Sequence, residues 1–166
     1  MSEAFYLTDP DGLGIEVYAD RPRENWQRVG RELVMGAGSV DLLGLESVAG
    51  PTRWAGMPSG TVIGHVHLHV ADLARASAFY SGALGFDRMM WSYPGARFFG
   101  AGGYHHHVGT NVWAGADALP AGDDEARLVE WTIELPDAAA AAVATSLAVA
   151  QCSVDREGVD AVVRDP

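Results

Sequence analysis

The six histidines of this chain fall into two short groups, and their spacing is the strongest chemical signal in the sequence. His65, His67 and His69 alternate with apolar residues, which places all three on one face of an extended strand. The second group is an uninterrupted triplet at residues 105–107. Imidazole binds transition metals and moves protons near neutral pH. A lone histidine is more often structural, but two groups of three favour a metal or acid–base site.

The histidine triplet opens a predicted strand over residues 106–113. Alternation along this strand places His105, His107 and Asn111 on one face and His106 on the other. Tyr104 directly precedes the triplet and has a hydroxyl that can transfer a proton.

The elements that must position these side chains can be predicted from residues 62–113. Asp72 is the expected N-cap of a helix that runs to about Leu84, where Gly85 ends it. Strands are predicted over residues 63–70, 86–91, 96–101 and 106–113. The order is therefore β-α-β-β-β.

A second, shorter copy of that order follows. It has a predicted strand at residues 128–135, an alanine-rich helix from 136 to about 150, and two short strands at 153–155 and 159–164. The last strand of the unit is missing. Glu130 lies on the first of these strands.

The N-terminal segment contains strands of the type that the second unit lacks. Residues 5–7 and 14–18 read as two strands around an Asp-Pro-Asp-Gly turn, with Glu16 and Tyr18 on one face. Two strands bury too little apolar surface to stand alone, so this hairpin must dock elsewhere. It can fill the vacant edge within the chain or in a partner, or the chain is a fragment of a longer product; these alternatives are compatible.

These observations predict three regions. Residues 1–20 form the closing hairpin of a preceding or permuted unit. Residues 21–61 form a linker rich in glycine and proline, with a short helix expected near residues 23–31. Residues 62–166 form the main domain without its final strand.

Composition excludes several classes of protein. Apolar residues make up 48% and charged residues 20%, with 11 Lys and Arg against 22 Asp and Glu, a formal net charge of −11. That charge disfavours nucleic acid and anionic lipid as partners. The apolar runs are too short to span a membrane, and no signal peptide is evident at the start of the chain. The single cysteine, Cys152, excludes an internal disulfide. We expect a cytoplasmic protein.

Three segments resemble one known family. IGHVHLHVADLARASAFYSGALGF (63–86), GGYHHHVGTNVWAG (102–115) and AFYLTDPDGLGIEVYADRPRENW (4–26) are similar to the vicinal oxygen chelate superfamily of glyoxalases, bleomycin-resistance proteins and extradiol dioxygenases. The resemblance is greatest to the C-terminal domain of two-domain catechol 2,3-dioxygenases. It implies an α+β fold in which paired βαβββ modules curl a mixed sheet into a cup.

The resemblance also implies a divalent metal in that cup. The family's ligand positions correspond to His65, His107 and Glu16, with Glu130 as a further candidate where relatives often have histidine. Fe(II) is the expected metal, with Mn, Ni or Zn as alternatives. Acid–base roles are expected from His105, Tyr104 and His67.

Three functions follow from this resemblance. The first is extradiol cleavage of a small aromatic substrate with vicinal oxygens. The second is a glyoxalase- or epimerase-type lyase or isomerase, favoured if Glu130 joins Glu16 at the metal. The third is non-catalytic binding of a small molecule, as in bleomycin-resistance proteins. A homodimer is expected, because an unfinished sheet edge favours strand exchange.

Overall fold

The centre of the molecule is a mixed four-stranded sheet. The computed structural model describes residues 1–115, 118–157 and 160–165. The sheet consists of β5 (Val66–His69), β6 (Asp87–Met90), β7 (Ala96–Gly100) and β8 (Val108–Asn111), in the order β5-β8-β7-β6. β5 and β8 are parallel, and the other two pairs are antiparallel. The predicted β-α-β-β-β order and the α+β class are confirmed.

The helix between β5 and β6 begins where the sequence predicts. The Asp72 carboxylate accepts hydrogen bonds from the backbone N–H groups of Ala74 and Arg75. α2 (Leu73–Ser77) then continues into a π-helical turn, η2 (Ala78–Ala83), and Gly85 follows with φ +83°. Within the described residues, no helix combines the length and apolar character needed to cross a bilayer.

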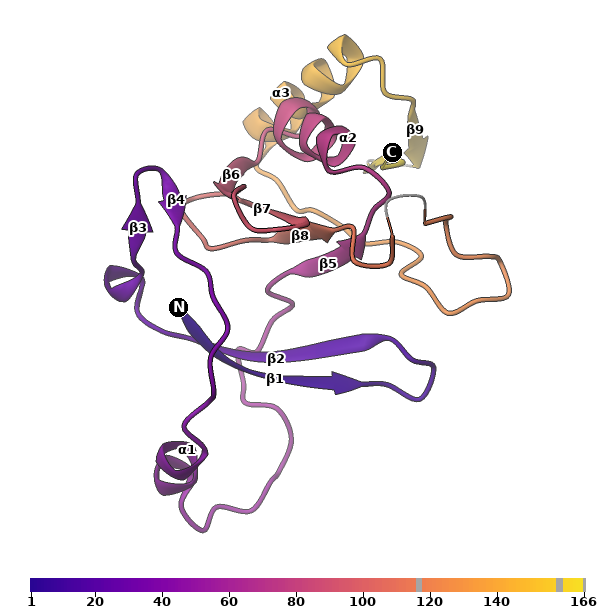
Figure 1. The fold of residues 1–166 in the computed structure, drawn as a ribbon. Helices are drawn as coiled ribbons and strands as arrows, with labels where there is room; N and C mark the ends of the chain where they lie inside the picture. The colour runs from indigo at the N-terminus through magenta and orange to yellow at the C-terminus, as the bar shows by residue number, and fades with distance from the viewer. Residues whose placement is uncertain (116–117, 158–159, 166) are drawn as a thin grey trace.

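The hydrophobic core lies between this helix, the sheet and α3 (Asp137–Val149). Tyr80, Phe99 and Val108 are fully buried, and Leu147 brings α3 against them. Figure 1 shows α2 and α3 together over one face of the sheet. The opposite face is therefore free to carry a site.

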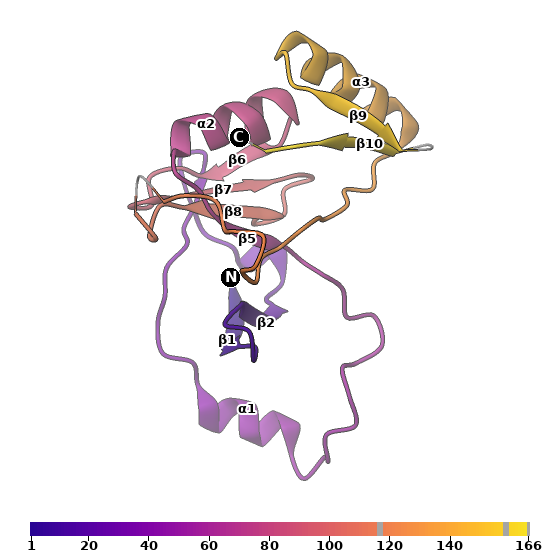
Figure 2. The ribbon, with the colours of Figure 1, turned by 90° about the vertical axis from the view of Figure 1, so that its right-hand side faces the viewer.

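The N-terminal hairpin lies on that opposite face. β1 (Ser2–Thr8) and β2 (Gly14–Asp20) form the predicted antiparallel pair, below the four-stranded sheet in Figures 1 and 2. β9 (Val154–Glu157) and β10 (Asp160–Val163) form a separate two-stranded sheet. The hairpin therefore does not supply the last strand of the second unit in this structure, although it docks beside the first.

The segment that follows the hairpin is only partly a linker. The helix expected near residues 23–31 is reduced to a 3-10 turn, η1 (Arg23–Asn25), and β3 (Arg28–Val29) pairs with β4 (Glu32–Leu33). The Glu32 carboxylate accepts from two backbone N–H groups just after β6, which attaches β4 to the main sheet. α1 (Leu42–Ala49) projects away from the rest of the molecule (Figure 2).

One predicted strand is wrong. Residues 128–135 alternate as a strand should, yet the structure has no strand there. A strand is stable only when a neighbouring strand pairs with its backbone, and this segment has no such neighbour in the sheets of the described chain. Val129 is consequently 83% exposed.

Candidate metal centre

A carboxylate and an imidazole from distant parts of the sequence meet on the free face of the sheet. His65 lies directly before β5, and its Nε2 donates to Glu16 Oε2 on β2 over 2.7 Å. The His65 side chain is 8% exposed and that of Glu16 is 22% exposed. Two of the ligand positions that the resemblance implies are therefore in contact, although the hairpin does not fill the edge of the second unit.

The alternation of the hairpin explains why Glu16 faces His65. Glu16 pairs with Tyr6 and Ala4 pairs with Tyr18, so these side chains share the face turned toward the sheet. The Tyr18 ring packs edge-on against His65, with 4.9 Å between ring centroids. The hydrogen bond from His65 lowers the pKa of the Glu16 carboxyl despite its partial burial. Glu16 is therefore ionised, as a metal ligand must be.

His106, and not His107, is the member of the histidine triplet that lies beside the Glu16–His65 pair. The His106 ring lies 4.3 Å from the His65 ring and 5.0 Å from Phe98, measured between centroids. The side chain is buried, and burial together with the neighbouring imidazoles lowers the pKa of His106 to about 2. Strand alternation predicted the opposite face, but β8 begins only at Val108, so the alternation does not reach back to the triplet.

The other two sequence-predicted ligands lie apart from the Glu16–His65 pair. The His107 ring stacks near Tyr104 and Phe86, and its Nδ1 accepts from the backbone N–H of Ala101 over 3.2 Å. Glu130 is exposed on the segment that forms no strand. The two-glutamate arrangement that would favour glyoxalase-type chemistry is therefore not formed.

His67 is held beside Glu16 by an asparagine. Asn111 Oδ1 accepts from the Trp113 backbone N–H over 3.0 Å, so its Nδ2 is the atom that donates to His67 Nε2, over 2.9 Å. His67 Nδ1 therefore carries the proton and points toward Glu16 Oε1, 4.0 Å away. Burial lowers the pKa of His67, so the ring is neutral.

Asp20, a residue that the sequence patterns did not single out, links His105 and Tyr104. Its Oδ1 lies 3.0 Å from His105 Nε2, and its Oδ2 accepts from the Tyr104 hydroxyl over 2.8 Å. His105 Nδ1 in turn lies 2.8 Å from His106 Nδ1. Asp20 shares the inward face of β2 with Glu16 and Tyr18, which is the signal that could have identified it.

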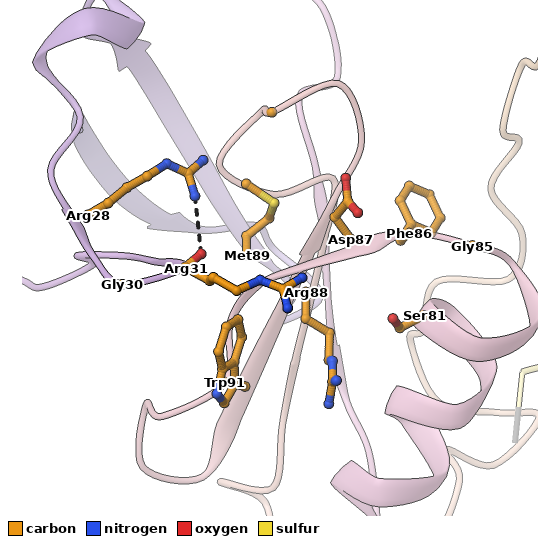
Figure 3. Close-up of a pocket in the computed structure, with 11 residues that line it drawn as sticks. Arg28, Gly30, Arg31, Ser81, Gly85, Phe86, Asp87, Arg88, Met89 and Trp91 are labelled. Atoms are coloured by element: carbon orange, nitrogen blue, oxygen red, sulfur yellow. Dashed lines mark hydrogen bonds between the residues drawn. The ribbon is translucent and has the colours of Figure 1, made fainter.

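A large cavity lies elsewhere, between the β3–β4 hairpin and β6. Its volume is about 690 Å³, and Arg28, Arg31, Arg88, Phe86 and Trp91 are among the residues that line it. Figure 3 shows these side chains around the opening, with Arg28 bonded to the Arg31 carbonyl. None of the candidate site residues lines this cavity, so we place the site at the histidine cluster instead.

Comparisons with known proteins agree with the resemblance seen in the sequence. The profile of the Glyoxalase/Bleomycin resistance protein/Dioxygenase superfamily matches residues 62–145. The chain belongs to this superfamily. A catechol-2,3-dioxygenase of Bacillus subtilis (strain 168) is 52% identical over 140 residues, which are 82% of this chain and 48% of that protein. The chain thus spans about half the length of this curated relative. No solved structure gives a significant match.

The residues of this superfamily member fit a divalent metal in part. Two ligands bound to one ion at about 2.1 Å lie roughly 3 Å apart, close to the 2.7 Å between His65 and Glu16. Within residues 1–115, 118–157 and 160–165, no group of three His, Cys, Asp or Glu side chains is already arranged as a finished metal site. The nearest further imidazole is that of His106, whose ring centroid lies 4.3 Å from that of His65.

Proposed function

We propose that this chain is the metal-binding portion of an extradiol dioxygenase of the catechol-2,3 type. Such an enzyme cleaves a small aromatic ring beside two adjacent hydroxyl groups and adds both atoms of O2 to it. The observation that carries the proposal is the Glu16–His65 contact of 2.7 Å on the inner face of a superfamily domain. The name of the Bacillus relative supports the same chemistry.

The proposed metal is Fe(II), with His65, His106 and Glu16 as its ligands in this chain. Two histidines and one carboxylate are the donor set of non-haem Fe(II) oxygenases, and a dioxygenase relative implies a divalent metal. His107 and Glu130 remain weaker candidates, because neither lies at the Glu16–His65 pair. When bound, iron would supply the open coordination positions that a catechol and O2 require. Mn, Ni and Zn are the alternative occupants.

The surrounding residues suit an aromatic substrate. Phe98 and Trp113 flank His67, with ring centroids 6.0 and 5.6 Å away, and would exclude water from one side of a bound ring. His67 keeps an N–H directed at the Glu16 side of the site, where it can donate to a substrate oxygen. Tyr104 and His105 both bond to Asp20, and we propose that this linked group takes part in the acid–base steps of the reaction.

The test is metal content and ring cleavage in matched variants. The protein is reconstituted with Fe(II) without oxygen, and bound metal is measured by elemental mass spectrometry. We expect one equivalent in the wild type, and loss of most of it in His65→Ala, His106→Ala and Glu16→Gln. His107→Ala is the matched control within the triplet and should retain iron. Oxygen consumption with catechol is then measured on the same proteins, and we expect it only in those that retain iron.

The outcomes separate the remaining possibilities. Loss of iron in His107→Ala but not in His106→Ala would contradict the ligand set proposed here. A wild type that binds no metal would overturn the enzyme proposal and leave small-molecule binding. A stoichiometric site that binds metal but consumes no oxygen with catechol would contradict the dioxygenase reaction.

A homodimer is also proposed. The outer face of the N-terminal hairpin exposes Phe5, Leu7 and Ile15, which are 47%, 54% and 46% exposed. Neighbouring apolar side chains left on a surface mark an interaction site. A second copy of this chain is the proposed partner.

A further inference from the structure

A continuous chain of hydrogen bonds links Tyr104 to the candidate site through Asp20, the last residue of β2. It begins at the Tyr104 hydroxyl, passes through both oxygens of Asp20 to His105 Nε2, and continues from His105 Nδ1 to His106 Nδ1. The three links are 2.8, 3.0 and 2.8 Å long. Both imidazoles are buried, with 0% and 5% of the residue exposed.

The link between Asp20 and His105 fixes which nitrogen of His105 carries its proton. A carboxylate can only accept hydrogen bonds, and Tyr104 already donates to its other oxygen. His105 must therefore donate to Asp20 through Nε2–H. A neutral imidazole carries one proton, so His105 Nδ1 is left with a lone pair.

The link between His105 and His106 then fixes which nitrogen of His106 carries its proton. The two Nδ1 atoms of His105 and His106 are 2.8 Å apart, so one of them must carry a proton. Because His105 Nδ1 has the lone pair, His106 Nδ1 is the donor. The lone pair of His106 is then on Nε2, the nitrogen not used in this bond.

We propose that Asp20 is a positioning residue that sets the tautomer of His106 through His105 and so leaves His106 Nε2 free to bind a divalent metal ion. The metal in this statement rests on the proposed function, whereas the tautomer does not. A carboxylate that fixes a histidine ligand through its other ring nitrogen is a familiar device. Here the carboxylate acts across an intervening imidazole.

The location of the three side chains supports this role. Asp20 is the last residue of β2, the strand that also carries Glu16. The hairpin therefore carries both Glu16, a proposed ligand, and Asp20, which sets the binding nitrogen of His106. Trp26 covers His105, with 5.3 Å between ring centroids, and keeps the intervening ring out of water.

The test is the proton position on each ring in the metal-free protein. Long-range ¹H–¹⁵N spectra of protein labelled at histidine distinguish a protonated ring nitrogen from one with a lone pair. We expect Nε2–H on His105 and Nδ1–H on His106 in the wild type. Asp20→Ala should lose the fixed pattern, so that both His106 nitrogens give averaged signals. Tyr104→Phe leaves the Asp20–His105 bond in place and should keep the wild-type pattern.

A Zn²⁺ titration by calorimetry measures the consequence for metal binding. We expect Asp20→Ala to weaken Zn²⁺ binding by about 10- to 100-fold, the usual effect of losing such an outer partner. Nε2–H on His106 in the wild type, or an unchanged pattern in Asp20→Ala, would overturn the proposal. The wild-type spectrum decides this even if the variant fails to fold. The expected tautomers in a wild type that binds no Zn²⁺ would overturn the metal function and leave the tautomer assignment standing.

Discussion

His106 is a buried histidine surrounded by other rings. It lies between His65, His105 and Phe98, and burial, followed by the charges of its histidine neighbours, lowers its pKa to about 2. In the unfolded chain the same ring titrates near 6.5. Below about pH 6.5 the His106 ring is therefore protonated in the unfolded state and neutral in the folded state. The free energy of unfolding must rise with pH across this range and fall as the solution is acidified.

We expect metal-free protein to lose stability as the pH is lowered from 7 to 5. One such group contributes about 1.4 kcal/mol per pH unit once the pH is well below 6.5. Urea titrations at several pH values measure this slope. His106→Gln should reduce the slope by up to that amount, whereas His69→Gln, at an exposed position, should leave it unchanged. Equal slopes in the wild type and His106→Gln would contradict the burial of a neutral His106.

At the residue scale, strand alternation predicts the faces of Glu16 and His65 but not the position of the His106 ring. Glu16 and His65 could be predicted, because each lies on or beside a regular strand where alternation fixes the face. His106 could not, because the triplet follows the Gly102–Gly103 turn and precedes β8. Side-chain direction in such a loop depends on its tertiary contacts.

At the scale of elements, the helix after β5 connects the site to the core. Its first turn depends on the Asp72 carboxylate, which accepts from two backbone N–H groups over 2.6 and 3.1 Å. Its second half carries Tyr80, whose hydroxyl donates to Asp165 near the end of the chain. Val66 and Leu68 of β5 pack against the same core as this helix, which holds β5, and with it His65 and His67, in place.

Asp72→Ala is expected to reduce the free energy of unfolding by about 1 kcal/mol, because two helix N–H groups lose their acceptor. Chemical denaturation followed by circular dichroism measures the change. Asp72→Ser restores an oxygen that can accept and should recover most of the loss. An Asp72→Ala protein as stable as the wild type would show that the core alone holds this helix.

Elements with local signals could be predicted, and those that depend on a partner could not. The α2 region has its cap and its terminal Gly85, and β6 and β7 have a turn between them. Residues 128–135 have an equally clear alternation but pair with no strand in the described part of the chain. Alternation shows that a segment suits a sheet; it does not provide the neighbouring strand.

At the scale of the whole molecule, apolar surface remains uncovered on the hairpin. Phe5 and Leu7 on β1 lie on the same face as Ile15 and Val17 on β2, opposite to Glu16. Phe5, Leu7 and Ile15 are about half exposed. The hairpin face opposite Glu16 is therefore available for association with a second copy of the chain.

We expect this protein to be a dimer at micromolar concentration, as measured by light scattering after size exclusion. Ile15→Asp would place a charge on the apolar face and should shift the protein to the monomer. Leu43→Asp on α1 replaces a more exposed apolar side chain away from the hairpin and should leave the dimer intact. A wild-type monomer at all concentrations would contradict the proposed association.

The candidate site is divided between two sheets that share no strand pairing. Glu16 and Asp20 lie on the β1–β2 hairpin, while His65 and His106 lie beside the four-stranded sheet. An ion held between them would lose the Glu16 ligand whenever the hairpin lifts from the sheet. Its residence time would then depend on how often the hairpin opens as well as on the exchange of each single ligand. The lifetime of the occupant would accordingly respond to mutations in the Tyr18 and Trp26 packing that holds the hairpin down, and not only to mutations of the ligands.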